Sequence, residues 1–175
     1  MSAPDASADP RSAEPPTLLV AAAVVIEAGR VLLTQRKAGT HLAGAWEFPG
    51  GKVRAGEDPR HALVRELREE LGIETVVDEV MDVTFHRYPE RSVLLLFYGA
   101  RRTPSSNEPE ALDVAAFRWA KSHELVEASF PPADVAILRK VRARLAAEAT
   151  EGLVLPILPP SPPRLRGGSR RRGEK

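Results

Sequence analysis

An unbroken apolar run at residues 18–27 is the first regular feature of the chain. The run is short and rich in Val and Ala, so it predicts a buried strand rather than a helix. Residues 28–30 predict a turn and apolar residues return at 31–35, which together predict a hairpin. Further strands are predicted at 46–48, at 74–88 with a bend near 78–79, at 92–98 and at 115–119. A turn at 89–91 joins two of them into a second hairpin, with 92–98 in a central position.

A glycine turn, a short loop and a helix of about four turns are predicted within residues 51–73. Asp58 is a favourable N-cap, Pro59 suits the first helical position, and Gly72 suits the end of the helix. Four apolar residues of this helix fall on one side: Leu63, Val64, Leu67 and Leu71. That side is predicted to pack on the core.

A second long helix is predicted from about residue 130 to residue 149, after a short helix at 122–126. Its apolar stripe is formed by Ile137, Leu138, Val141 and Leu145, and its outer face by Arg139, Lys140, Arg142 and Arg144. Strands and helices thus follow one another in a chain of 175 residues, which predicts a single α/β domain at residues 17–150.

Three carboxylates share one face of the first predicted helix, because Glu66, Glu69 and Glu70 are spaced i, i+3, i+4. They repel one another, and two of them lie near the negative end of the helix dipole. A bound divalent cation would relieve this conflict, and Mg²⁺ or Mn²⁺ prefers such oxygen ligands. The alternative is a solvated charged face on which Arg65 and Arg68 pair with the glutamates.

The surrounding residues favour the metal hypothesis. Gly51, Glu57, Arg65-Glu66-Leu67, Glu69-Glu70 and Gly72-Ile73 match every defined position of the Nudix box, so the chain resembles the Nudix hydrolase family over about residues 17–149. The flanking segments 35–36, 42–44 and 46–52 resemble its MutT-type branch, which cleaves nucleoside triphosphates. The resemblance implies a Nudix fold, a mixed β-sheet sandwiched between α-helices.

The resemblance also implies catalytic and metal-binding residues. The implied catalytic residues are Glu57, Arg65, Glu66, Glu69 and Glu70. Glu57 and Arg65 form an internal pair that orients the other carboxylates, and one glutamate takes the proton of the attacking water. The implied metal-binding residues are Gly51, Glu57, Glu66, Glu69, Glu70 and Asp113. Glu110 competes with Asp113 for that role, and for both the alternative is a solvated loop acid.

The predicted substrate-binding residues are Arg36, Phe48, Gly50, Gly51, Lys52, Arg91 and Asp134. The two glycines permit close approach of a phosphate, and Lys52 supplies a point charge. By resemblance, Arg36, Phe48 and Arg91 contact the base. Their alternatives are a surface arginine, a core phenylalanine and a turn arginine, and the alternative for Lys52 is a loose surface lysine.

Asp134 departs from the family pattern, in which the matching residue is Asn. An Asn amide both donates and accepts at an oxidised guanine edge, whereas an ionised Asp only accepts unless it is protonated. By resemblance, the expected substrate is 8-oxo-dGTP or a related oxidised (d)NTP, as in nucleotide-pool sanitation and mutation avoidance, and the departure at Asp134 is what gives the alternative. A CTP or 5-hydroxy-CTP type of nucleotide is the alternative. Asp134 also suits a helix N-terminus without any role in binding.

Composition bounds the remaining possibilities. The net charge of +1 gives no global attraction to nucleic acid, and the absence of cysteine suits a reducing cytoplasm. No apolar run reaches the roughly 20 residues that span a bilayer, so no membrane partner is expected. Residues 1–16 predict a disordered leader and 151–175 a disordered Pro/Arg-rich tail. A monomer or weak dimer is expected, with no stable nucleic-acid partner; a nucleic-acid-binding Nudix module using the basic tail is the alternative.

Overall fold

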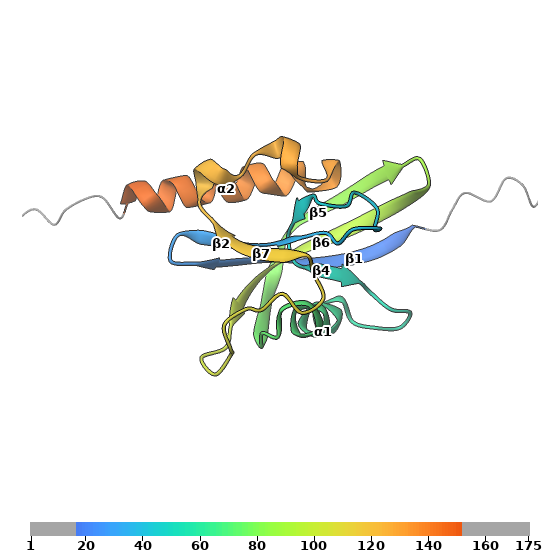
Figure 1. Cartoon of the computed structure of the whole chain (residues 1–175), viewed down its shortest axis with the longest axis horizontal. Helices are drawn as coiled ribbons and strands as arrows, with labels where there is room; N and C mark the ends of the chain where they lie inside the picture. The colour runs from blue at the N-terminus through green and yellow to red at the C-terminus, as the bar shows by residue number, and fades with distance from the viewer. Residues whose placement is uncertain (1–16, 152–175) are drawn as a thin grey trace, which may run out of the picture.

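A mixed β-sheet lies between two long helices in the computed structural model, which describes residues 17–151 (Figure 1). Its strands are β1 (Leu18–Glu27), β2 (Arg30–Gln35), β3 (Trp46–Glu47), β4 (Gly50–Lys52), β5 (Thr75–Tyr88), β6 (Arg91–Arg102) and β7 (Ala116–Ala120). Its long helices are α1 (Pro59–Leu71) and α2 (Val135–Glu151), and its 3₁₀ helices are η1 (Ser122–Glu124), η2 (Glu127–Ser129) and η3 (Pro132–Asp134). The predicted α/β sandwich is confirmed.

Strand β1 is central in the sheet, whose order is β3-β2-β1-β6-β5. It runs parallel to β6 and antiparallel to β2 and β4, and β7 pairs with β2. Both predicted hairpins are present, as β1–β2 and β5–β6. The register of β5 shifts between Val77 and Asp82, where the bend was predicted.

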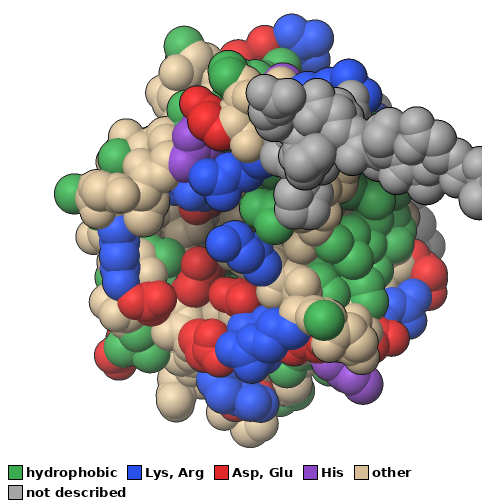
Figure 2. Space-filling view, turned by 90° about the vertical axis from the view of Figure 1, so that its right-hand side faces the viewer, with side chains coloured by type: hydrophobic (Ala, Val, Ile, Leu, Met, Phe, Trp, Pro, Cys, Tyr) green, Lys and Arg blue, Asp and Glu red, His purple; other side chains and the backbone are tan. Residues whose placement is uncertain are grey.

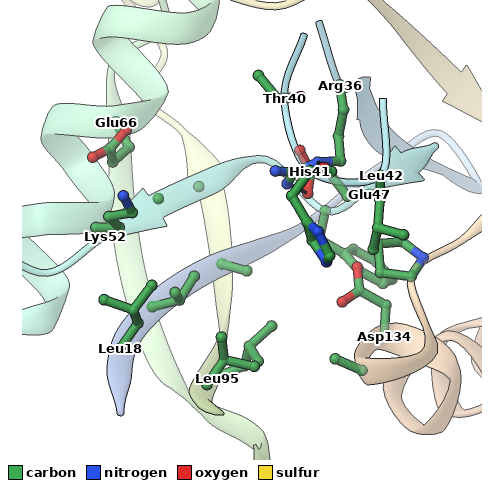
Figure 3. A pocket seen from close by; sticks show the side chains of 18 of the residues that line it. Leu18, Arg36, Thr40, His41, Leu42, Glu47, Lys52, Glu66, Leu95 and Asp134 are labelled. Atoms are coloured by element: carbon green, nitrogen blue, oxygen red, sulfur yellow. Dashed lines mark hydrogen bonds and ion pairs between the residues drawn. The ribbon is translucent and has the colours of Figure 1, made fainter. Parts of the chain in front are cut away.

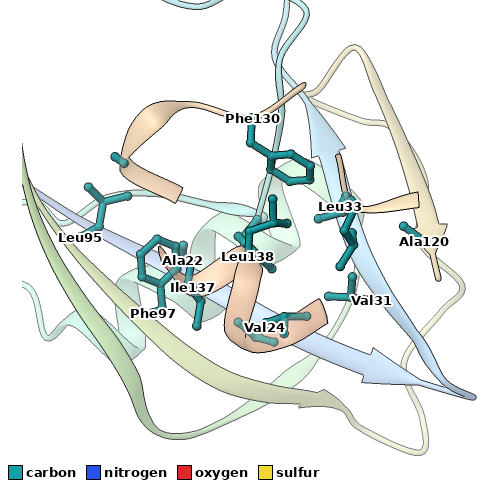
Figure 4. Packing of buried hydrophobic residues seen from close by; sticks show 14 of the residues in the cluster. Ala22, Val24, Val31, Leu33, Leu95, Phe97, Ala120, Phe130, Ile137 and Leu138 are labelled. Carbon is teal, nitrogen blue, oxygen red and sulfur yellow. The ribbon is translucent and has the colours of Figure 1, made fainter. Parts of the chain in front are cut away.

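The unbroken apolar sequence of β1 follows from burial on both faces. Ala21, Ala23 and Val25 join the core cluster beneath α1, whereas Ala22 and Val24 join the cluster beneath α2 (Figure 4). A strand covered by helices on both sides has no polar face, so the sequence shows no alternation there. This arrangement fixes the two helices on opposite faces of β1.

Helix α1 begins and ends at the predicted residues. The Asp58 carboxylate accepts a hydrogen bond from the backbone N–H of Arg60 at 2.7 Å. Gly72 ends the helix in the left-handed region at φ 68°, and its N–H donates to the carbonyl of Arg68. Leu63, Leu67 and Leu71 are fully buried beneath the helix, and Val64 is partly buried. The helix is therefore held firmly enough to position the glutamates on its other side.

Leu67→Ala is expected to lower the free energy of unfolding by about 2–5 kcal/mol, because it leaves a cavity in the core. Leu112→Ala is the matched control, since Leu112 is exposed. We expect the control to change stability by less than about 1 kcal/mol. Urea denaturation of both variants measures the difference, and equal losses would contradict the assignment of the α1 core.

Three details of the predicted elements are wrong. Gly50 and Gly51 do not form a turn; they belong to β4 and pair with Ala22 and Ala21 of β1. Gly50 has φ 151°, and a Cβ atom there would overlap the backbone carbonyl of Ala21. The pairing therefore needs a glycine. The segment 122–126 forms only the 3₁₀ turn of η1, and β6 extends beyond its predicted range on both sides.

The apolar residues that helped to predict β5 are not core residues. Val76, Val80, Val83 and Phe85 remain 41–53% exposed, because β5 is an outer strand of the sheet. The predicted leader and tail at 1–16 and 152–175 lie outside the described residues. Within residues 17–151, no helix is both long enough and apolar enough to cross a membrane.

Candidate functional site

A cavity of about 350 Å³ lies over β1, β4 and β6, between α1 and the segment that leads into α2. Most of the predicted site residues line it: Arg36, Phe48, Gly50, Gly51, Lys52, Glu66, Glu70, Arg91, Asp113 and Asp134. Glu57, Arg65 and Glu69 do not line it. Arg65 contacts two residues that do, Glu66 and Lys52, and Glu57 and Glu69 contact Arg65. Acidic and basic side chains crowd the middle of one face of the molecule, beside a wide apolar area (Figure 2).

Arg65 connects three of the predicted catalytic glutamates. Its guanidinium donates to both carboxylate oxygens of Glu57 at 2.9 and 3.0 Å, to Oε1 of Glu66 at 2.7 Å and to Oε2 of Glu69 at 3.3 Å. Its Nη2 also donates to the carbonyl of Lys52 at 3.2 Å, which ties α1 to β4. The hydrogen bonds from Arg65, and then that from the Arg54 N–H, lower the pKa of Glu57 to about 2. The predicted Glu57–Arg65 pair is therefore present in the structure.

Glu66 faces the cavity from α1, at the end near Lys52 (Figure 3). Its side chain is 18% exposed, and its carboxylate lies directly against Gly51, where a Cβ atom would overlap it. Glu66 is thus enclosed by Arg65 on one side and by the backbone of β4 on the other. Only a residue without a side chain at position 51 leaves room for the carboxylate in this place.

Glu70 is partly buried in the last turn of α1. It accepts a hydrogen bond from the backbone N–H of Gly50 at 3.2 Å. Burial raises its pKa to about 8, and the nearby negative charges of Glu47, Glu66 and Asp113 add to the effect. A carboxyl group in such a place stays protonated near neutral pH unless a cation joins it.

The residues at this end suit a hard divalent cation. Their donor atoms are carboxylate oxygens together with the Gly51 backbone, the type of ligand that Mg²⁺ and Mn²⁺ prefer. Burial first, and then the charges of Glu47, Glu66 and Asp113, raise the pKa of Glu70, and a cation beside this carboxyl group would oppose that shift. Among residues 17–151, no three Asp, Glu, His or Cys side chains converge closely enough to hold a metal as they stand. Arg65 occupies the space between Glu57, Glu66 and Glu69. The predicted ligands fit a divalent cation by the chemistry of their oxygen atoms, and the metal site remains a prediction.

The two competing loop acids are placed differently. Asp113 lines the cavity, forms an ion pair with Lys37, and donates its N–H to the carbonyl of Glu70 at 3.2 Å. Glu110 is absent from the lining, and its N–H donates to the carbonyl of Leu71. The loop thereby follows the C-terminal end of α1, and only Asp113 is brought to the cavity.

The opposite end of the cavity holds a second group of buried charges. Asp134 is 4% exposed at the end of η3. Arg36 donates from Nη1 to Glu47 at 2.6 Å and from Nε to the carbonyl of His41 at 2.6 Å. Burial, and next the charge of Glu47, raises the pKa of Asp134 to about 8, although the Phe48 backbone and Arg36 oppose the shift. Burial therefore favours the neutral, protonated form of Asp134 near neutral pH.

Phe48 and Arg36 each fit both the predicted role in the site and the structural alternative to it. Phe48 is 3% exposed and packs edge-on against Phe97, yet it also lines the cavity. Arg36 lines the cavity while its guanidinium holds Glu47 and the loop at His41. Lys52 and Arg91 lie on the cavity wall, at the α1 end and at the start of β6.

Glu47, His41 and Tyr88 also line the cavity, although none of them was predicted as a site residue. Burial raises the pKa of Glu47 against the opposing charge of Arg36. A signal for Glu47 was present, because a charged residue between two aromatic residues in a strand needs a buried partner. His41 and Tyr88 stack edge-on with ring centroids 4.9 Å apart, a contact between distant segments that no local pattern predicts.

The middle of the cavity is apolar. Its floor consists of five side chains from two paired strands: Leu18, Val20, Ala22, Val93 and Leu95. The cavity therefore has a carboxylate-rich end near α1, an apolar floor, and a polar buried end near Asp134 (Figure 3). This arrangement suits an elongated ligand with a highly charged end and a planar polar end.

Comparisons with known proteins show which proteins are similar to this chain in sequence and in fold. A family model described as the NUDIX domain matches residues 21–140. The chain is 39% identical over 133 residues to a CTP pyrophosphohydrolase of Escherichia coli, across 75% of this chain and 96% of that protein. It is 37% identical to an 8-oxo-dGTP diphosphatase of Haemophilus influenzae, across 66% of this chain and 83% of that protein. A MutT NUDIX hydrolase of Burkholderia pseudomallei superposes with a TM-score of 0.64 at 27% identity, across 72% of this chain and 98% of that structure.

Proposed function

We propose, since the chain belongs to the Nudix hydrolase family, that it hydrolyses a nucleoside triphosphate to the monophosphate and pyrophosphate with Mg²⁺, or Mn²⁺ in its place. The observation that carries the proposal is one cavity that has carboxylates at one end and the buried Asp134 at the other. The names of the relatives, 8-oxo-dGTP diphosphatase and CTP pyrophosphohydrolase, support a nucleotide substrate. Removal of oxidised nucleotides from the pool, and hence mutation avoidance, is the proposed role.

The phosphate end is formed by residues of β4 and α1. Lys52 and the backbone of Gly50 and Gly51 would bind the polyphosphate, and Glu66 would accept the proton of the attacking water. Glu57 and Arg65 hold Glu66 in place through the hydrogen bonds described above. A divalent cation held by these carboxylates supplies charge neutralisation at the polyphosphate and increases the acidity of water. No protein nucleophile is needed, because water attacks a phosphorus of the anhydride directly, the bond between the α- and β-phosphates breaks, and the monophosphate and pyrophosphate are the two products.

The base end favours a base edge that presents both a donor and an acceptor. A protonated Asp134 has one O–H donor and one carbonyl acceptor, as an Asn amide does. Its neutral state therefore supports an oxidised guanine, despite the departure from Asn. The alternative, a cytosine base, would use ionised Asp134 as an acceptor for the exocyclic amine, and the CTP pyrophosphohydrolase relative favours it.

Pyrophosphate release tests the proposal. We would measure kcat/KM with Mg²⁺ for 8-oxo-dGTP, dGTP, dCTP, CTP and 5-hydroxy-dCTP, with EDTA as the control for metal dependence. The expected result is strong turnover of one oxidised nucleotide that EDTA abolishes. The absence of pyrophosphate release from every nucleotide, with Mg²⁺ or Mn²⁺ present, would reject the proposal and favour the nucleic-acid-binding module.

The protonation state of Asp134 predicts a pH dependence that Asp134→Asn should remove. As pH rises through about 8, Asp134 loses its donor. The KM for 8-oxo-dGTP is then expected to rise about tenfold, the effect of one lost hydrogen bond. Asp134→Asn keeps a donor at every pH, so its KM should not follow that rise. A falling KM for dCTP over the same range would favour the cytosine alternative instead.

Thermal unfolding at several pH values provides a second measurement of the protonation state of Asp134. The folded-state pKa of Asp134 lies above its ordinary value of 3.8, so the folded protein binds a proton that the unfolded chain has released. The stability of the wild type therefore falls as pH rises from about 4 towards about 8. The Tm of Asp134→Asn should increase relative to wild type over this range. A difference in Tm between Asp134→Asn and the wild type that stays constant with pH would contradict a protonated Asp134.

A further inference from the structure

We propose that an apolar sheet face beside α1 binds a second copy of this chain, in a weak dimer whose two-fold axis passes near Val83. We call this face the apolar shelf, and its members are Leu19 of β1, Leu94 and Leu96 of β6, and Val83 and Phe85 of β5. Leu18 and Val93 of the cavity floor alternate with these residues along β1 and β6, so the shelf is on the opposite face of the sheet from the cavity. The dimer therefore does not depend on the proposed function.

The strand register places the shelf residues side by side. Leu94 pairs with Leu19 on one side and with Phe85 on the other, and Leu96 pairs with Val83. Side chains of directly paired residues lie on the same face of a sheet. Leu96 packs against the core cluster beneath α1, so the whole shelf belongs to the α1 face.

Helix α1 leaves the shelf uncovered. Val83 and Phe85 are each 53% exposed, and Leu19, Leu94 and Leu96 are partly exposed. A wide apolar area is visible on this side of the molecule (Figure 2). Among the described strands β5 pairs only with β6, so its outer edge is open as well. Edge strands commonly carry Lys or Pro that prevent association, and β5 contains neither.

The charges around the shelf are complementary to those of a second copy. Arg87 lies at one end, with its guanidinium carbon 5.9 Å from the centre of the Phe85 ring. Glu79 lies at the other end, on the α1 side, where it pairs with Arg60. Both Arg87 and Glu79 are four positions from Val83 in the sequence. A two-fold axis near Val83 that sets the two β5 strands in opposite directions therefore brings Arg87 of each copy to Glu79 of the other.

The segments outside the described residues offer less to the shelf than a second copy does. Apart from proline, residues 1–16 contain one large apolar side chain, that of Met1. Residues 153–158 are apolar, but they follow the end of α2, which packs on the opposite face of the sheet from α1. A second copy supplies an equal apolar area, and a net charge of +1 opposes its approach only weakly.

The size of the shelf predicts weak association. An apolar patch on a monomer typically measures about 300–600 Å², whereas a standard interface buries about 800 Å² of each partner. The shelf and its flanking charges together reach only the lower limit, so we expect a dissociation constant of roughly 1–100 µM. The cavity stays open in such a dimer, because it lies on the other face of β1 and β6.

Sedimentation equilibrium of the full chain, from about 1 to about 300 µM, tests the surface. Phe85→Glu should raise the Kd of the dimer about tenfold or more, because it buries a charge without a partner. Val76→Glu is the matched control: Val76 is 41% exposed on β5, and its neighbour Val77 is the residue that faces the α1 cluster. This control should keep the wild-type Kd, and both variants should keep the wild-type circular dichroism spectrum. A wild type that stays monomeric throughout, or an unchanged Kd in Phe85→Glu, would overturn the inference.

Charge reversal tests the two-fold arrangement. Arg87→Glu should raise the Kd about three- to tenfold, because it faces Glu79 of the other copy, and adding Glu79→Arg should restore the wild-type Kd. Equal weakening in the single and double variants would overturn the arrangement about Val83. Leu155→Asp examines the apolar segment that follows α2. Loss of association in Leu155→Asp, with the wild-type Kd kept in Phe85→Glu, would assign the association to that segment and overturn the role of the shelf.

Discussion

Glu66→Gln is expected to lower kcat by about 1,000-fold, within the range that general-base catalysis contributes. The substitution keeps the size of the side chain and removes its ability to accept a proton. The side chain remains between Arg65 and Gly51, so the shape of the cavity should be unchanged. Because substrate binding uses other residues as well, KM should change by less than about fivefold. Steady-state release of pyrophosphate at saturating Mg²⁺ measures both constants.

Glu79→Gln is the control for this result. Glu79 belongs to β5, its side chain is 92% exposed, and it is absent from the cavity lining. Its ion pair with Arg60 at 3.4 Å is exposed and contributes little to stability. We expect wild-type kinetics from this variant. If Glu66→Gln also kept more than about one tenth of wild-type kcat, another carboxylate would have to take the proton.

The helix that presents these glutamates was predictable because its signals are local. Asp58, Pro59 and Gly72 mark its ends within a few residues, and the leucine spacing marks its buried side. The hairpins were predictable for the same reason, since each joins neighbouring strands. The structure agrees with the prediction at both ends of α1 and of β1, whereas β6 extends beyond its predicted range.

Strand β4 could not be predicted from local signals. It has only three residues, two of them glycines, and its partner β1 lies about thirty residues earlier in the chain. A glycine pair more often indicates a turn. Here the absence of side chains allows close packing. Gly50 packs against the backbone of β1, and Gly51 packs against the carboxylate of Glu66.

The base end of the cavity was predictable only in part. Arg36 and Asp134 were named from the family resemblance, but the partly buried ion pair joins Glu47 of β3 to Arg36, which directly follows β2. The protonation of Asp134 depends on burial and on the charge of Glu47, and neither is visible in a sequence. Likewise, the spacing of Val83 and Phe85 indicated a strand but not which face would be covered.

Gly51→Ala is expected to lower kcat by about 100-fold with little loss of stability, although it adds only one methyl group. The new Cβ would overlap the Glu66 carboxylate, which Arg65 holds from the other side at 2.7 Å. The carboxylate is the flexible end of a long side chain, so it can move away at a cost to the fold below about 1 kcal/mol. It then leaves the position in which it accepts a proton, and displacements of this size are costly in catalysis.

Gly99→Ala controls for the loss of a strand glycine, because the nearest atoms to its new Cβ lie 3.7 Å away and neither glycine has a left-handed backbone. It should keep wild-type kinetics. Adding Glu66→Asp to Gly51→Ala shortens the side chain by one methylene and should make the two substitutions clearly non-additive in kcat. Wild-type kcat in Gly51→Ala would show that the Glu66 carboxylate does not act from its place beside Gly51. Fully additive losses would show that the two positions act independently.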